Sequence, residues 1–192
     1  MKGGDLYMNV VEPLRDLNLI QDISEYLRDK RERDYVLFMT GIYLGRRICD
    51  FLSLRVRDVR GKDYIYFKED KTNKNIRIPI NSELKKVYTD YCKNKRSYEY
   101  LFKGTGRKKP ISRVRVWQIL NEAADEFECD DRIGCHTLRK TFGYWLYQDT
   151  HDVVAIQELF NHSDTSITKR YIGVNQDSKD KLVRGLSFNK RR

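Results

Sequence analysis

Apolar side chains recur every three or four positions along much of the chain, which is the spacing of helices that bury one face. Within residues 17–30, Leu17, Ile20, Ile23 and Leu27 follow this pattern, with charged residues between them. The same reasoning predicts helices at about 33–44, 46–52, 84–95, 114–127, 137–147, 152–160, 165–171 and 178–186. Ser82 and Ser112 are placed to cap two of these helices.

The pattern changes after Asp58, where two short runs rich in β-branched and aromatic residues follow one another. These runs, 63–67 and 75–80, are separated by a polar turn that contains Lys71 and Lys74. A run, a turn and a second run predict two antiparallel strands, with Pro79 at an edge or a strand end. The expected fold class is mainly α with a small antiparallel β-sheet (α+β), in one domain.

Length and composition are those of one globular domain. A chain of 192 residues with 40% hydrophobic residues can bury roughly 70% of its unfolded surface, so its core needs no metal or disulfide. The longest apolar stretch, 35–45, is about half of the ~20 residues that a membrane-spanning helix needs, and the N-terminus lacks the pattern of a signal peptide. A cytoplasmic protein is expected. The four cysteines lack C-x-x-C spacing and are interpreted as reduced, neutral thiols.

The charge balance changes the picture. With 38 Lys+Arg against 28 Asp+Glu, the chain carries a formal charge of +10, which favours a polyanionic partner such as nucleic acid. Simple solubility is the alternative explanation. A basic, glycine-broken loop spans 103–110, and a basic tail spans 189–192.

The candidate chemistry gathers around two histidines. His136 and Arg139 are three positions apart on a predicted helix and so face the same way. His162 precedes Tyr171 by nine positions, across a short capped turn. Imidazole, guanidinium and phenol groups of this kind could hold a phosphodiester and attack it. Cys129 and Cys135, together with the two histidines, lack the spacing of zinc ligands, so no metal site is expected.

Four elements in order carry a family resemblance. They are Gly45-Arg46-Arg47-Ile48-Cys49-Asp50-Phe51-Leu52-Ser53-Leu54, then His136-x-x-Arg139, then Leu159-Phe160-Asn161-His162-Ser163 followed by Tyr171. Together they resemble the catalytic domain of the tyrosine recombinases, the phage integrase family, over residues 17–188. Two departures are an Asn at 161, where the family usually has Gly, and the lack of a glycine after Lys71.

The resemblance implies a set of functional residues. The implied catalytic residues are Arg47, Lys71, His136, Arg139, His162 and Tyr171, with Asp50 supporting Arg47 and Lys74 as the alternative to Lys71. The candidate DNA contacts are Lys74, Lys103, Arg107, Lys108, Lys109 and Lys140. These roles follow from the family and from the demands of phosphoryl transfer.

The implied reaction is site-specific recombination of double-stranded DNA. Tyr171 would attack phosphorus and form a phosphotyrosyl enzyme that conserves the bond energy, so neither ATP, a metal nor another cofactor is required. His136 is the candidate base and Lys71 the candidate acid for the departing 5′ oxygen. Topoisomerase-like relaxation and a DNA-binding accessory role without turnover remain alternatives. The sequence does not indicate the DNA site, or whether the event is integration, excision, inversion or resolution.

The expected organisation is an N-terminal extension at 1–16, the catalytic domain at 17–188 and the tail at 189–192. Residues 1–7 are either native or derived from cloning, with Met8 as a candidate start. The N-terminal clamp domain common in the family has no counterpart here, so the chain is either a single-domain member or an excised domain. Leu182, Val183 and Leu186 form an apolar face beyond Tyr171. We expect a monomer in solution and a homotetramer on paired DNA sites.

Overall fold

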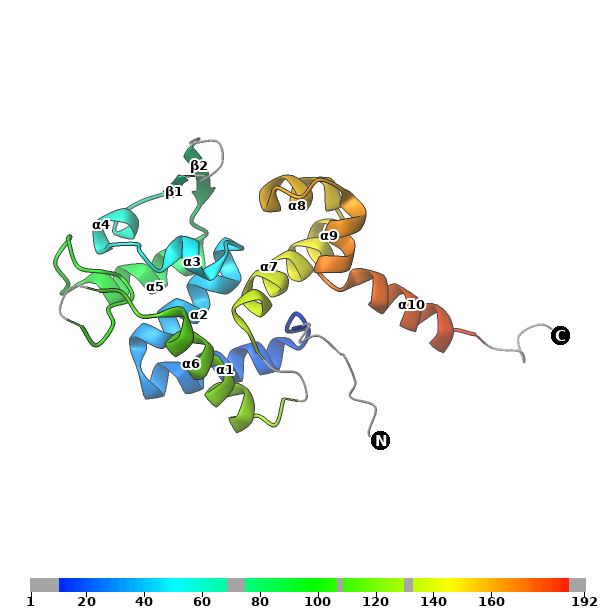
Figure 1. Cartoon of the computed structure of the whole chain (residues 1–192), viewed down its shortest axis with the longest axis horizontal. Coiled ribbons are helices and arrows are strands. Elements are labelled where there is room, and N and C mark those ends of the chain that lie inside the picture. The colour runs from blue at the N-terminus through cyan, green and yellow to red at the C-terminus, as the bar shows by residue number, and fades with distance from the viewer. Residues whose placement is uncertain (1–10, 69–74, 107–108, 130–132, 187–192) are drawn as a thin grey trace, which may run out of the picture.

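A long apolar helix, α2, forms the centre of the fold. The computed structural model describes residues 11–68, 75–106, 109–129 and 133–186. Helix α2 (Glu32–Leu44) is buried on almost every side and packs against α1 (Leu17–Lys30), α5 (Ser82–Cys92) and α7 (Cys135–Thr150). A helix without a polar face must be enclosed in this way. The helix α6 (Arg113–Glu126) packs against α1 and α7 and completes this main core (Figure 1).

A small hairpin projects from one side of the helical body (Figure 1). Strands β1 (Tyr64–Lys68) and β2 (Asn75–Pro79) pair antiparallel, with Ile65 opposite Ile78 and Phe67 opposite Ile76. The side chains of β1 alternate between exposed and buried, so Ile65 and Phe67 enter the core. Two short helices, α3 (Ile48–Phe51) and α4 (Val56–Val59), connect α2 to this hairpin.

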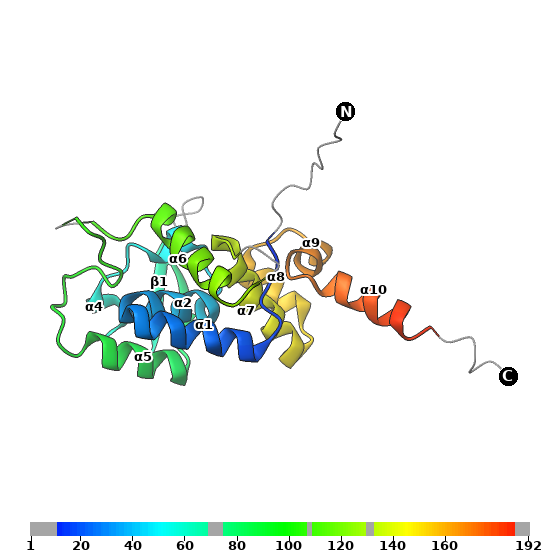
Figure 2. The same ribbon diagram turned by 90° about the horizontal axis from the view of Figure 1, so that it is seen from below.

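The C-terminal third forms a second, smaller core against α7. Helices α8 (Val153–Phe160) and α9 (Thr165–Tyr171) contribute Ile156, Phe160 and the following Ile172 to it. Helix α10 (Val174–Arg184) then extends away from the body, as both views show (Figures 1 and 2). None of the helices in the described ranges combines the length and apolar character needed to cross a membrane.

The N-terminal segment before α1 is attached to α7 by hydrogen bonds. The Leu14 amide donates to Thr141 Oγ1 (2.9 Å), and the Trp145 indole donates to the Leu14 carbonyl (2.9 Å). Arg15 pairs with Glu12 (2.8 Å) and with Asp177 of α10 (3.1 Å). This segment therefore contacts both α7 and α10, the helix that follows Tyr171 in the chain.

The periodicity predicted most of these elements. The expected fold class is confirmed, and the helices at 17–30 and 165–171 have the predicted bounds. Several bounds differ by a few residues, as for α7, which spans 135–150 against the predicted 137–147. Three differences are of another kind or larger. Helix α4 was not predicted, α10 begins four residues before the predicted 178, and α5 is capped by Asn81 rather than Ser82. Because α5 begins at Ser82, Asn81 is its N-cap residue. Its side chain accepts a hydrogen bond from the amide of Leu84, the third residue of the helix (2.8 Å).

Close packing at Gly143 should hold Tyr171 in place against α7. A methyl group at this position would lie 2.7 Å from Ile172 Cγ2 and 2.8 Å from the Phe160 ring. We expect Gly143→Ala to lower the free energy of unfolding by about 1–3 kcal/mol through overpacking. Urea denaturation measures this loss. Gly106→Ala is the matched control, because its added carbon approaches nothing closer than Lys109 Cβ at 3.9 Å, and an equal loss in both variants would contradict the packing argument.

Candidate active site

Helix α7 presents its first turn to the phenol of Tyr171. His136 Nδ1 lies 3.1 Å from Tyr171 Oη, although the two residues are 35 positions apart. Their rings meet edge to face, with centroids 6.5 Å apart. Tyr171 is the last residue of α9, so the packing of α9 and the following Ile172 against α7 sets this contact. An imidazole and a phenol at this distance can exchange a proton.

Arg139 is held in the interior by two backbone carbonyls. Its guanidinium donates to the carbonyls of Gly45 (2.9 Å) and Phe160 (2.9 Å) and lies over the Phe160 ring, 4.1 Å from the centroid. Only 3% of the residue is exposed. Because a guanidinium has five N–H donors, these two bonds fix the group and leave donors for an anion. Arg139 therefore joins the end of α2, the end of α8 and α7 at one point.

Arg47 follows the left-handed turn that ends α2. Gly45 adopts φ +60°, and a side chain there would clash with the Phe142 ring. Arg47 is exposed, and its amide donates to Asp50 Oδ2 (3.1 Å). The Asp50 carboxylate forms its ion pair with Arg46 (3.5 Å). Asp50 thus orders the turn that carries Arg47, because its carboxylate accepts the hydrogen bond from the Arg47 backbone amide.

His162 also packs against the tyrosine ring. Its ring lies 5.2 Å from that of Tyr171, nearly perpendicular, and its Nδ1 is 3.0 Å from the buried Thr168 hydroxyl. Asn161 adopts the left-handed conformation (φ 51°) that ends α8, as expected for the residue that replaces glycine. This turn directs His162 toward α9.

The electrostatics of the cluster suit a proton acceptor beside a tyrosine. Burial lowers the pKa of His136, and Arg139 and Arg47 lower it further, so the neutral imidazole is favoured. Burial, Arg139 and Arg47 lower the pKa of His162 in the same way. Burial raises the pKa of Tyr171, whereas Arg139 and Arg47 oppose the rise. The two arginines thus favour both a neutral base and an ionised phenol.

This lowered pKa predicts where activity is lost in acid. A histidine whose folded pKa lies below its ordinary value of about 6.5 accepts a proton only at pH below that value. We therefore expect any reaction that uses His136 as its proton acceptor to stay fast between neutral pH and about pH 6.5 and to slow below it, measured as reaction rate against pH. Between the folded and ordinary pKa values the unfolded chain binds more protons, so the free energy of unfolding falls as pH drops there. An acidic limb above pH 7 in a folded sample would contradict this assignment.

Not all predicted residues join this cluster. Lys103 and Lys109 are exposed on a loop closed by a bridge between Lys103 and Pro110. Lys140 is only 7% exposed, and its ammonium faces the Tyr171 ring 5.2 Å from the centroid. The remaining predicted residues, Lys71, Lys74, Arg107 and Lys108, lie outside the described residues.

The sequence of the chain matches the family model of the Phage integrase family over residues 15–178. The chain belongs to the phage integrase family. It is 46% identical over 171 residues to the probable integrase/recombinase YoeC of Bacillus subtilis (strain 168), covering 89% of this chain and 94% of that protein. It is 29% identical over 187 residues to tyrosine recombinase XerD of Corynebacterium glutamicum, covering 94% of this chain and 60% of that protein. The resemblance to tyrosine recombinases is confirmed.

Solved structures of recombinases share the fold. The crystal structure of XerA recombinase has a TM-score of 0.71 at 17% identity, covering 92% of this chain and 67% of that one. XerH bound to its palindromic difH substrate has a TM-score of 0.70 at 17% identity, covering 91% and 53%. These likenesses show a shared fold, and the family match and the integrase and recombinase relatives make the chain a site-specific tyrosine recombinase.

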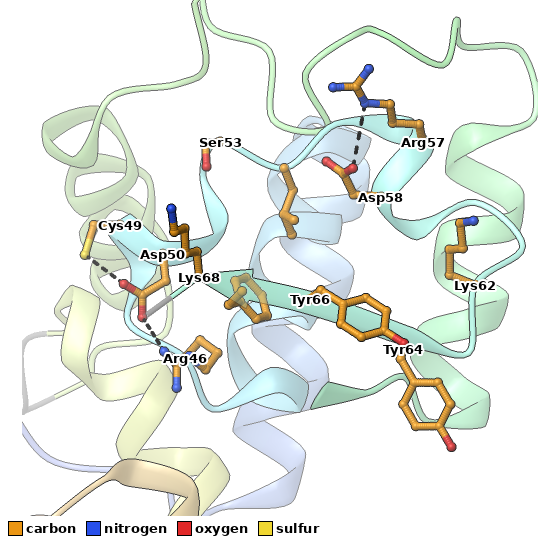
Figure 3. Close-up of a pocket in the computed structure, with 12 residues that line it drawn as sticks. Arg46, Cys49, Asp50, Ser53, Arg57, Asp58, Lys62, Tyr64, Tyr66 and Lys68 are labelled. Carbon is orange, nitrogen blue, oxygen red and sulfur yellow. Dashed lines mark hydrogen bonds and ion pairs between the residues drawn. The ribbon is translucent and has the colours of Figure 1, made fainter. Parts of the chain in front are cut away.

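A basic hollow lies beside the cluster of Arg47, His136, Arg139, His162 and Tyr171. The sequence analysis did not predict it. It encloses about 830 Å³ between α3, α4 and β1 (Figure 3). Its cationic lining residues are Arg46, Arg57, Lys62 and Lys68. Asp50 and Asp58 also line it, and Tyr66, 64% exposed, stands on the outer face of β1. The alternation of β1 could have revealed this basic and aromatic face.

The sequence analysis also missed two contacts near the site. Thr168 lies three positions before Tyr171, so helical spacing could have placed it beside the site. Arg46 precedes Asp50 by four positions, the spacing of a helical ion pair.

In the described part of the chain, no three His, Cys, Asp or Glu residues gather as a metal site would require. The described cysteines form no disulfide, and burial raises the pKa of the Cys49, Cys92 and Cys135 thiols.

Proposed function

We propose that this chain cleaves and rejoins DNA strands through a covalent bond between Tyr171 and a 3′ phosphate. The observation that carries the proposal is the 3.1 Å contact between His136 Nδ1 and Tyr171 Oη, beside Arg139 and within the field of Arg47. A phenol, a base that is neutral at physiological pH and two guanidinium groups supply a nucleophile, a proton acceptor and anion ligands. This set matches the needs of phosphodiester cleavage.

Proton and electron movements balance in each step. The phenol gives its proton to His136 Nδ1, and the oxygen bonds to phosphorus as the bond from phosphorus to the 5′ oxygen breaks. The departing 5′ oxygen takes a proton, for which Lys71 is the candidate donor and Lys74 the alternative. Rejoining reverses the steps with the 5′ hydroxyl of another strand. The phosphodiester count is unchanged, so no external energy source is needed.

The phosphate is bound by groups that are already oriented. Arg139 is fixed by two carbonyls, and Arg47 by the turn that Asp50 orders, so little reorganisation accompanies the change in charge at phosphorus. The Thr168 hydroxyl lies 3.0 Å from His162 Nδ1 and 3.3 Å from the Asp164 carbonyl. When it donates to His162 Nδ1, the opposite ring nitrogen carries a hydrogen that can bond a phosphate oxygen. Planar guanidinium groups can bind two oxygens at once, which a lysine cannot do.

The surface around the cluster suits a DNA backbone. Arg57, Lys62 and Lys68 around the hollow, with Lys103 and Lys109 on their loop, are proposed to contact phosphates. The exposed Tyr66 adds a flat apolar surface against which a sugar or base can pack. Affinity from such contacts falls steeply as salt rises.

Covalent trapping tests the proposed reaction. Duplexes drawn from DNA that flanks the gene are nicked next to candidate sites, so that the short cleaved strand diffuses away and the intermediate accumulates. After denaturation, a protein–DNA adduct with a free 5′ hydroxyl on the released strand is expected. Adducts attached through the 5′ end, or DNA binding without any adduct, would overturn the proposal.

Two other activities are separated by the products. The integrase and recombinase relatives do not favour topoisomerase-like relaxation or a DNA-binding role without turnover. A supercoiled plasmid with two copies of the site should yield recombinant circles. Relaxed circles without recombinants would instead indicate relaxation.

We further propose that the chain is a monomer in solution and a homotetramer on paired DNA sites. Helix α10 extends from the body and exposes Leu182 (76%) and Val183 (72%), with Leu186 just beyond it (57%). A groove of about 680 Å³ between α1, α2, β2, α7 and α8 is lined mainly by apolar side chains and offers a surface for this helix from a neighbouring copy. Its lining includes Leu17, Ile20, Ile42, Phe142 and Leu146.

Leu182→Asp should separate cleavage from assembly. The charge would have to be buried in the apolar groove, so we expect at least a tenfold loss of paired-site complexes in gel-shift assays, equivalent to about 1.4 kcal/mol. Adduct formation on a single nicked site should be nearly unchanged, because α10 contributes no residue to the cluster. Lys179→Asp on the same helix is the control for charge alone. A stable tetramer without DNA in light scattering would contradict the proposed assembly.

A further inference from the structure

Lys140 occupies an unexpected place beside the nucleophile. It lies one turn beyond His136 on the same face of α7, so the two side chains meet different parts of Tyr171. His136 meets the hydroxyl at 3.1 Å, and the Lys140 ammonium faces the ring at 5.2 Å from its centroid. With 7% of the residue exposed, Lys140 is poorly placed to touch a DNA backbone.

The groups around the ring and the ammonium define the electrostatics. Tyr171 is approached by His136, Arg139 and Lys140 from α7, by His162 after α8 and by Arg47 before α3. Burial has the largest effect on the pKa of Lys140 and lowers it. From the N-terminal segment, Glu12 raises this pKa and Arg15 lowers it. The Glu12 carboxylate is itself bonded to Arg15 (2.8 Å).

We propose that Lys140 is a positioning residue whose ammonium, facing the ring of Tyr171, favours the ionised form of the phenol in both strand cleavage and rejoining. This inference rests on the proposed function. A cation over an aromatic face is attracted to its electron density, and a phenolate ring carries more of that density than a phenol ring. The partly buried setting strengthens the attraction relative to water.

The same contact acts in both directions of the reaction. In cleavage the phenol must lose its proton as its oxygen bonds to phosphorus, and in rejoining it must leave phosphorus as a phenolate. His136 handles the proton at the oxygen, whereas Lys140 acts on the ring. The residue therefore works through Tyr171 and does not itself touch the phosphate.

The decisive measurement is the ionisation of Tyr171 in the full chain. Tyrosine labelled with ¹³C at Cζ is followed by NMR against pH without DNA, and the Tyr171 signal is identified by its loss in Tyr171→Phe. In Lys140→Met the titration should move to higher pH, and Lys140→Arg should restore it. Lys86→Met, at an exposed position on α5, is the matched control and should leave the titration unchanged. Lys140→Gln serves if the methionine variant unfolds.

Cleavage kinetics supply a second readout. On a nicked duplex, Lys140→Met should form adduct roughly three- to tenfold more slowly at neutral pH, with the deficit shrinking as pH rises. An unchanged Tyr171 titration in Lys140→Met would overturn the proposal. So would a deficit that is equal at every pH and follows DNA affinity, which would make Lys140 a DNA contact. Because the NMR titration needs no DNA, failure of the wild type to form adduct would count against the proposed function and not against this inference.

Discussion

Tyr171→Phe is expected to abolish covalent attachment to DNA while leaving DNA affinity nearly unchanged. The substitution removes the oxygen that contacts His136 and keeps the ring that packs against Phe160 and His162. We expect adduct formation to fall by at least roughly 10⁴-fold, as with the loss of other enzymatic nucleophiles. Quantitative trapping on nicked duplexes measures the rate, and gel shifts at fixed salt measure the affinity.

A second tyrosine provides the matched control. Tyr98→Phe removes a hydroxyl that only receives a surface hydrogen bond from Arg96 (2.8 Å) at a residue that is 55% exposed. It should form adduct at the wild-type rate. Residual adduct in Tyr171→Phe at more than about one per cent of wild type would show that another side chain attacks the phosphate.

The sequence predicted the fold well because local patterns determine most of it. Apolar residues at helical spacing predicted α1 with its observed bounds, and two β-branched and aromatic runs around a polar turn predicted the hairpin. The missed helix α4 has four residues, which is too short for periodicity to register. Its start is marked instead by Asp58, whose carboxylate accepts from the Arg55 amide (2.7 Å).

The surroundings of the candidate site were harder to predict than its motifs. Motif spacing predicted that His136, Arg139 and Tyr171 lie together, and α7 and α9 place His136 and Tyr171 in contact. The surroundings depend on tertiary packing that spacing does not encode. A lysine next to Arg139 in a basic sequence was expected to face DNA, yet the N-terminal segment covers that side of α7 and Lys140 turns toward the tyrosine ring.

Arg139→Lys should impair both stability and cleavage, although the charge is retained. The guanidinium donates to the carbonyls of Gly45 and Phe160 at once, and a single ammonium cannot reach both in the same geometry. We expect the free energy of unfolding to fall by about 1–3 kcal/mol, measured by urea denaturation, because a buried carbonyl loses its charged partner. Adduct formation should fall by roughly 10²–10³-fold, because a preoriented ligand of the phosphate is lost.

The two effects of Arg139→Lys are separable by comparison with an exposed arginine. Arg115→Lys changes the same chemistry on α6, where the guanidinium pairs with Glu122 at the surface (2.8 Å), and should alter neither quantity beyond about 0.5 kcal/mol. If Arg139→Lys were destabilised but cleaved at the wild-type rate when fully folded at low temperature, Arg139 would be a structural link between α2, α7 and α8 only. A loss of cleavage at unchanged stability would instead assign its main interaction to the phosphate. The carbonyl contacts predict that both losses occur together, because the bonds that fix the guanidinium are also those that aim its remaining donors at Tyr171.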